Sequence, residues 1–246
     1  MKKNLLTFTV LATVLSAFVM IGCVKEDKDA IKMETVNKGI LMKPGKDGKE
    51  YAVVDLELNT RTLWATCNIG ATSPEQTGDY IAWGETETKD SYTWTTYRYC
   101  NGSHLTINRY TLDKEHADNK MIDSTKIIKP EDDAAKQIMG DDWRIPSRRE
   151  YIELINSCDA QCCKLNGVWG YLFTSKKNGN SIFLPLAGLR DMEEQLYKGT
   201  YGFYWSNELY STTDAFMLNL ARDTNPVCTK YQERDMGLPI RPITKK

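Results

Sequence analysis

The chain has 246 residues, with 32 basic and 33 acidic side chains and a formal net charge of −1. This balance excludes the strongly basic character that is typical of nucleic-acid binding proteins. The length, together with 6 Trp and 13 Tyr, is enough for one large domain with a well-packed core.

The first 22 residues have the pattern of a secretory signal. Met1-Lys2-Lys3 is followed by an apolar run over residues 5–21, slightly short for a membrane-spanning helix of about 20 residues. Met20-Ile21-Gly22-Cys23 resembles a lipobox, which implies cleavage before Cys23 and attachment of palmitate-type acyl chains to it. Several such chains make a stable membrane anchor. Removal of residues 1–22 takes away two lysines and no acid, so 30 basic and 33 acidic residues remain.

A charged segment follows the predicted lipidation site. Val24-Lys25-Glu26-Asp27-Lys28-Asp29 resembles the surface-export signal of some Gram-negative lipoproteins, although a charged run is often only a hydrophilic tether. We therefore expect an outer-membrane lipoprotein exposed at the cell surface; the alternative is the periplasmic face. Residues 23–46 are expected to form a lipidated flexible tether, and residues 47–246 a single domain.

Six cysteines remain beyond Cys23. An exported protein meets an oxidising compartment, so disulfides are permitted, but six cysteines allow 15 pairings. Cys158, Cys162 and Cys163 lie close together, yet the chain has only two histidines to complete a zinc site. We expect no metal and no cofactor.

Strand patterns open and close the domain, and helix patterns lie between them. Alternating or apolar segments predict strands at residues 51–58 and 63–70, and a long aromatic loop follows over 71–129. Helices are expected at 132–139, which ends before Gly140, and at 147–156, where Ser147 and Glu150 form a capping box. Further strands are expected at 181–185, 202–206, 215–220 and 238–243. This order predicts an α+β domain with two central helices.

Several motifs in order resemble the FISUMP (major paralogous) domain family. They run from about residue 50 to residue 243 and are specific only as a set: Thr62-Leu63-Trp64-Ala65-Thr66-Cys67-Asn68-Ile69-Gly70-Ala71, Gly78-Asp79-Tyr80-Ile81-Ala82-Trp83-Gly84-Glu85, Trp143-Arg144-Ile145-Pro146, Asn166-Gly167-Val168, Ser181-Ile182-Phe183-Leu184-Pro185-Leu186-Ala187-Gly188, Tyr204-Trp205-Ser206 and Gly237-Leu238-Pro239-Ile240-Arg241-Pro242.

The resemblance implies a C-type-lectin-like fold, with paired terminal strands, small twisted antiparallel sheets, two helices and long loops. It implies no established catalytic centre. It also implies a disulfide between Cys67 and Cys158, because family members often carry cysteines at these places.

The aromatic loop holds the candidate binding residues. Trp94, Tyr97 and Tyr99 form a potential stacking platform for a sugar ring or a protein partner; the alternative for each is packing under the loop. Asp123-Ser124-Thr125 resembles a short bacterial O-glycosylation pattern, which makes Ser124 a candidate acceptor. Histidines in polar loops and isolated loop acids do not make a catalytic constellation.

The sequence therefore predicts a non-enzymatic surface lipoprotein. Its partners are expected to be the membrane, through the N-terminal lipid, and a glycan or surface protein held by a lectin-like domain. The alternative is a structural or assembly component of the envelope, such as an adhesin or a fimbria-associated subunit. No nucleic acid is expected.

Overall fold

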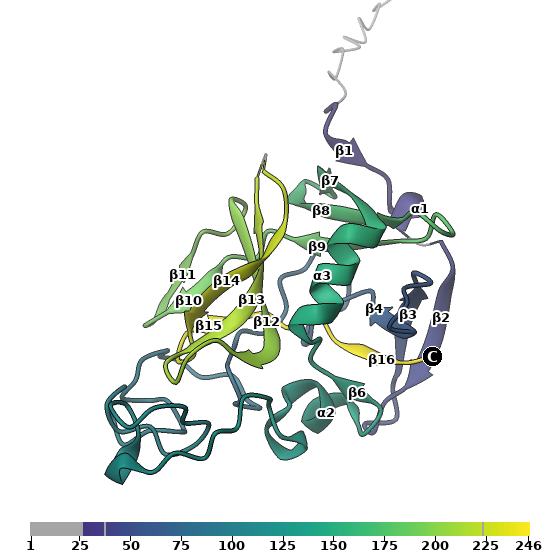
Figure 1. Ribbon diagram of the computed structural model, residues 1–246. Coiled ribbons are helices and arrows are strands. Elements are labelled where there is room, and N and C mark those ends of the chain that lie inside the picture. Colours follow the sequence, from purple (N-terminus) through teal and green to yellow (C-terminus); the bar gives the residue numbers. More distant parts are fainter. Residues whose placement is uncertain (1–26, 37, 223) are drawn as a thin grey trace, which may run out of the picture.

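Four β-sheets contain most of the regular secondary structure of the protein. The computed structural model describes residues 27–36, 38–222 and 224–246 (Figure 1). Cys23 lies outside these residues. A five-stranded antiparallel sheet has the order β2-β3-β4-β16-β6, formed by Ile40–Pro44, Glu50–Asp55, Thr62–Ala65, Ile243–Lys245 and Trp143–Arg144.

The second sheet has the order β1-β7-β8-β9. Its strands are Ala30–Ile31, Cys158–Leu165, Val168–Ser175 and Ser181–Pro185, and only the pairing of β1 with β7 is parallel. The turn that joins β7 to β8 is Asn166-Gly167, both residues with positive φ, as a tight hairpin requires.

The third and fourth sheets come mainly from the C-terminal part. The third consists of β12, β13 and β14 in chain order, at Tyr201–Leu209, Asp214–Ala221 and Val227–Glu233. The fourth has the order β11-β10-β15-β5, from the short strands Glu194–Leu196, Leu189–Asp191, Gly237–Leu238 and Ile81–Ala82.

The described helices are short. They are α1, α2 and α3, at Met33–Val36, Ala134–Met139 and Arg148–Ser157, with 3-10 turns η1 and η2 at Asp118–Lys120 and Pro130–Asp132. The capping box on α3 is confirmed: Ser147 accepts a hydrogen bond from the Glu150 backbone, and the Glu150 side chain accepts one from the Ser147 backbone. Asp133 caps α2 by accepting from two backbone N–H groups of its first turn.

The predicted α+β class with two central helices is wrong. Helices α2 and α3 form close to the predicted positions, but they are single elements on a structure built from four sheets. The prediction missed β7, β10, β11 and β14, whose polar, solvent-facing side chains hide the strand pattern. The structure does not show the C-type-lectin fold that the resemblance implied.

The predicted flexible tether is folded where the structure describes it. β1 extends the second sheet, and β2 pairs with β3 along its whole length. Ile31, Met33 and Val36 pack against apolar side chains of β7, β8 and β9. Apolar burial therefore holds this segment, which precedes residue 47, against the second sheet.

Two arginines are fully buried at the centre of the fold. Arg241 donates to the Asn68 side chain at 2.8 Å and to the carbonyl oxygens of Ala65, Thr66 and Phe183 at 2.5–3.0 Å. These bonds join the C-terminal segment to the first and second sheets. Burial lowers the pKa of Arg241 from its ordinary value, but an arginine stays charged in a protein.

Arg234 forms a similar set of buried hydrogen bonds at the aromatic loop. It donates to the Tyr97 hydroxyl at 2.7 Å and to the carbonyl oxygens of Arg109, Tyr110 and Thr212 at 2.9–3.1 Å. The rings of Trp83, Tyr97 and Tyr110 lie 5.1–5.6 Å from its guanidinium. Among the described residues, no carboxylate forms an ion pair with either buried arginine.

Replacement of Arg234 by Met is expected to lower the free energy of unfolding by at least about 3 kcal/mol, because three buried carbonyl groups lose their donor. Urea denaturation measures this change. Arg149→Met is the control, since Arg149 is exposed on α3, and it should change the free energy by less than about 0.5 kcal/mol. Equal, small effects of the two substitutions would show that Arg234 does not hold the loop.

Candidate functional site

The predicted aromatic platform lies inside the protein. Tyr97 and Tyr99 are only 3% and 6% exposed, and Trp94 is partly buried against the same core. The Tyr97 hydroxyl donates to the Trp83 carbonyl and accepts from Arg234. The three rings pack together edge to face, and the hydroxyl groups of the two tyrosines bind partners inside the protein. These residues therefore present no open stacking surface. The packing alternative holds for all three.

The aromatic loop is closed by its own polar network. The Asp132 carboxylate accepts hydrogen bonds from the hydroxyls of Tyr99 and Tyr110 and pairs with Arg109 at 2.6 Å. Burial, followed by the hydrogen bond to Asp132, raises the pKa of Tyr110 to about 12. The network therefore stabilises the loop and leaves none of these groups for a ligand.

The implied disulfide is not formed. Cys67 and Cys158 are free thiols, as are the other four cysteines among the described residues. Cys67 lies in the loop after β4, whereas Cys158 begins β7 and is buried in a different part of the core. Burial raises the pKa of Cys158 to about 12, so this thiol is not reactive near neutral pH.

Two further sequence-based predictions concern Ser124 and a metal site. Ser124 is exposed in the loop, so its glycosylation stays a prediction that the intact mass of the native protein checks. In the part of the chain that the structure describes, no three His, Cys, Asp or Glu side chains are grouped to hold a metal ion.

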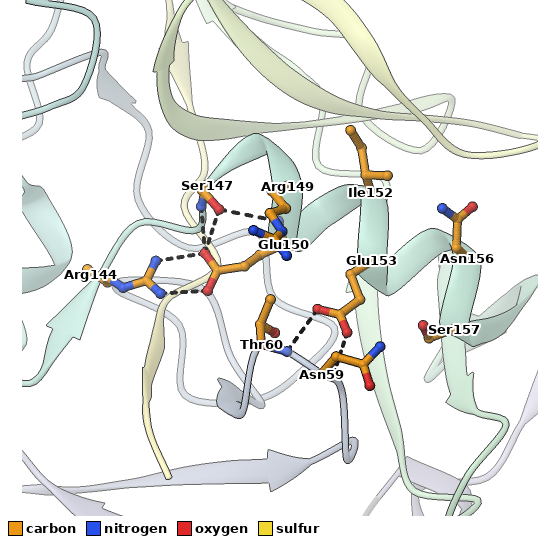
Figure 2. Close-up of a pocket in the computed structure, with 10 residues that line it drawn as sticks. All are labelled: Asn59, Thr60, Arg144, Ser147, Arg149, Glu150, Ile152, Glu153, Asn156 and Ser157. Carbon is orange, nitrogen blue, oxygen red and sulfur yellow. Dashed lines mark hydrogen bonds and ion pairs between the residues drawn. The ribbon is translucent and has the colours of Figure 1, made fainter.

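A pocket of about 730 Å³ lies along α3, from Ser147 to Ser157 (Figure 2). Its carboxylates already have partners. Glu150 accepts two hydrogen bonds from Arg144, at 2.5 and 2.7 Å, and two from Ser147, both at 2.8 Å. Glu153 accepts from the backbone of Asn59 and Thr60. These contacts cap the helix and attach the loop before β4.

The protonation of Glu150 agrees with a structural role. Burial acts to raise its pKa, but the hydrogen bonds from Arg144 and Ser147 outweigh burial and hold the pKa below its ordinary value. A general acid in glycoside hydrolysis needs the opposite shift. The pocket on α3 is therefore not our candidate site.

A second pocket, of about 470 Å³, lies between the β10–β11 hairpin and the third sheet. We call it the tyrosine groove. Tyr197 and Tyr201 are 55% and 36% exposed, in contrast to the buried platform. Tyr201 stacks on Phe203 at 5.6 Å, and Tyr197 stands edge-on to both rings at 5.7 and 6.2 Å. Three aromatic rings thus form one wall of a groove that is open to solvent.

The local backbone explains how the chain builds this wall. Tyr201 and Phe203 are two residues apart on β12, so their side chains lie on the same face of the sheet. Tyr197 comes from the β11–β12 connection and has a φ of +62°, a conformation that is uncommon for a bulky residue. Gly188 and Gly202 form an isolated β-bridge, and a Cβ at Gly188 would lie 2.0 Å from the Leu196 carbonyl oxygen. Gly188 therefore permits the close approach that brings Tyr197 to β12.

The same groove carries three polar side chains, among them Asn219, which lies next to Phe203 on the neighbouring strand β13. Asp191, Asn219 and Lys230 line it, and within the described residues no hydrogen bond or ion pair engages their side chains. This is the main contrast with the pocket on α3, where the carboxylates are occupied. Open rings beside free hydrogen-bonding groups are the usual composition of a small-molecule site.

Asp235 is a buried carboxyl group close in sequence to the groove residue Met236. It is 5% exposed, and its Oδ1 atom has no hydrogen-bond partner among the described residues. Burial, followed by repulsion from Glu233, raises the pKa of Asp235 to about 7. The folded protein thus binds a proton at Asp235 at pH values where the unfolded chain does not.

Sequence reasoning missed the tyrosine groove. The strand expected at 202–206 contains Phe203, and the spacing of Tyr201 and Phe203 was a readable sign of one aromatic face. The position of Tyr197 had no such signal, because it depends on a left-handed residue and on Gly188.

Comparisons with known proteins add no assignment. No family model, no curated protein and no solved structure matches the chain.

Asp235→Asn is expected to make the stability of the protein less dependent on pH. Because the pKa of Asp235 is raised in the folded state, its stabilising proton is bound at low pH and is lost as pH rises from about 4 to about 7. Relative to the wild type, the Asn variant should therefore gain stability across that window, by a few kcal/mol at most. Urea denaturation at pH 5 and pH 8 measures the difference.

The control for this substitution is Asp90→Asn, at an exposed position. It should leave the pH dependence unchanged. If Asp235→Asn and Asp90→Asn follow the same curve, Asp235 does not titrate in the folded protein as described.

Proposed function

We propose that the protein is a lipid-anchored binding module of the FISUMP type that holds a glycan in the tyrosine groove without catalysing a reaction. The observation that carries the proposal is the pairing of exposed Tyr197 and Tyr201 rings with unengaged Asp191, Asn219 and Lys230 side chains.

This composition suits a sugar ring for a physical reason. The faces of a pyranose carry C–H groups that pack on aromatic rings, while its hydroxyl groups need hydrogen-bond donors and acceptors. The groove offers both kinds of contact within one cavity. Tyrosine side chains have few rotatable bonds, so ordering them on binding costs little conformational entropy.

The proposed location is the outer membrane, with the domain exposed at the cell surface. It is supported by the secretory signal, by Gly22-Cys23 in the lipobox-like motif, and by the charged segment after Cys23. Within the described residues, no helix is long and apolar enough to cross a membrane.

Loss of either tyrosine ring should weaken glycan binding. We expect Tyr197→Ala and Tyr201→Ala each to weaken binding of any glycan identified on an array by about two- to tenfold, since one lost stacking contact is worth roughly 0.5–1.5 kcal/mol. Titration calorimetry measures the affinity. Leu105→Ala, at a similarly exposed apolar position in the aromatic loop, is the control and should bind normally.

Two results would contradict this function. Glycan binding that survives both tyrosine substitutions would place the site elsewhere. If no glycan on the array binds and one stoichiometric protein partner is recovered from envelope extracts, the protein would instead be a structural or adhesin component of the envelope.

Cys23→Ser should release the protein from the membrane. The serine hydroxyl cannot take the thioether-linked lipid, so the variant is expected in the soluble fraction, whereas the wild type fractionates with the outer membrane. Mass spectrometry of the N-terminal peptide checks the acyl chains directly. A wild-type peptide that carries no lipid on Cys23 would refute the anchor.

A further inference from the structure

We propose that one end of the molecule rests on the headgroup layer of the membrane that holds the lipid on Cys23. This end, which we call the Trp169 end, comprises Asp27, Lys164, Trp169, Arg222 and the connection that contains Tyr197 and Lys198. The proposal depends on the proposed lipid anchor and adds to it a fixed orientation of the domain.

The first argument is the length of chain between the lipid and the folded domain. Asp27 already belongs to the fold, because its carboxylate pairs with Lys164 at 2.6 Å. The backbone N–H of Lys164 also donates to the Asp29 carbonyl at 2.7 Å. Only three residues lie between Cys23 and Asp27. The four residue-to-residue steps from Cys23 to Asp27 span at most about 14 Å in any conformation. By comparison, a flexible tether of 24 residues has a root-mean-square length of roughly 27 Å.

The second argument is what lies beside Asp27. Lys164 and Trp169 are direct partners across β7 and β8, and the Lys164 ammonium lies 4.7 Å from the Trp169 ring centroid. The Arg222 guanidinium lies 5.3 Å from the same ring. The backbone N–H of Arg222 donates to the carbonyl of Thr200, the residue before Tyr201. A continuous series of contacts thus connects Asp27 to the tyrosine groove.

The arrangement of the elements agrees with these contacts. Figure 1 shows β1, β7 and β8 at one end of the molecule, while the aromatic loop and α2 lie toward the opposite end. A domain held by a linker of about 14 Å at β1 must therefore present this end, rather than the aromatic loop, to the membrane.

The side chains at the Trp169 end suit a membrane interface. Trp and Tyr are the residues that accumulate at the headgroup level, because their rings are apolar and their N–H and O–H groups are polar. Lys and Arg are attracted to phosphate groups at the same depth. Since the tyrosine groove opens beside this end, its glycan is inferred to be one carried by the envelope itself, close to the bilayer.

Trp fluorescence in vesicles tests the contact. The purified lipoprotein is inserted from outside into preformed vesicles of phosphatidylethanolamine and phosphatidylglycerol, with or without bromine on the acyl chains near the headgroup. We expect bromine to quench part of the emission, and Trp169→Phe to remove most of that quenching. Trp94→Phe is the matched control, because Trp94 is also partly buried but lies in the aromatic loop; it should leave the quenching intact.

Lysine acylation gives a second readout that needs no substitution in the core. Lys198 and Lys120 are both exposed, at the Trp169 end and in the aromatic loop respectively. Relative to soluble Cys23→Ser protein, the vesicle-bound lipoprotein should show loss of labelling at Lys198 and unchanged labelling at Lys120.

The outcomes separate this proposal from the anchor. Lipid on the Cys23 peptide, together with no bromine quenching and equal labelling of both lysines, would overturn the orientation and leave the anchor standing. Absence of lipid on Cys23 would overturn the anchor and this proposal with it. Glycan binding in solution is a separate result that neither outcome changes.

Discussion

Two positive charges buried without a carboxylate set the architecture of this protein. A buried guanidinium is tolerated only when hydrogen-bond acceptors surround it. Here those acceptors are mostly backbone carbonyl oxygens from strands and loops that are distant in sequence. Arg241 fixes the loop after β4 and the strand β9, and Arg234 fixes the aromatic loop and the turn before β13. Between the two arginines lies β15, which pairs with β10 and so positions the hairpin beside the tyrosine groove.

The sequence-based predictions succeeded where a local interaction decides the structure. The Ser147–Glu150 capping box depends only on neighbouring residues, and it formed as expected. The fold class failed because sheet formation depends on distant partners: β7 carries exposed residues such as Asp159 and Gln161, yet it pairs with β8 over its full length. The pairing of residue 30 with residue 164 likewise has no local signal, so the sequence alone did not predict that this segment joins a sheet.

Burial explains why the aromatic residues of the loop do not form the predicted binding platform. It also explains why the motifs behind the family resemblance are rich in Trp. Trp64, Trp83 and Trp205 belong to those motifs and are fully buried, so the motifs mark the core rather than a site. Tyr97 and Tyr99 follow Trp83 into the same core because Arg234 and Asp132 bind their hydroxyls. The candidate site is instead formed where aromatic rings stay exposed and polar groups stay unpaired, and only the three-dimensional structure reveals that combination.

The most direct test of this site is a titration of isotope-labelled protein with envelope glycans, followed by NMR. Our interpretation predicts that the first and largest chemical-shift changes occur at the amides of Tyr197, Tyr201 and Asn219, around one cavity. Changes centred instead on Glu150 and Glu153, beside α3, or on the aromatic loop around Trp94, would contradict it.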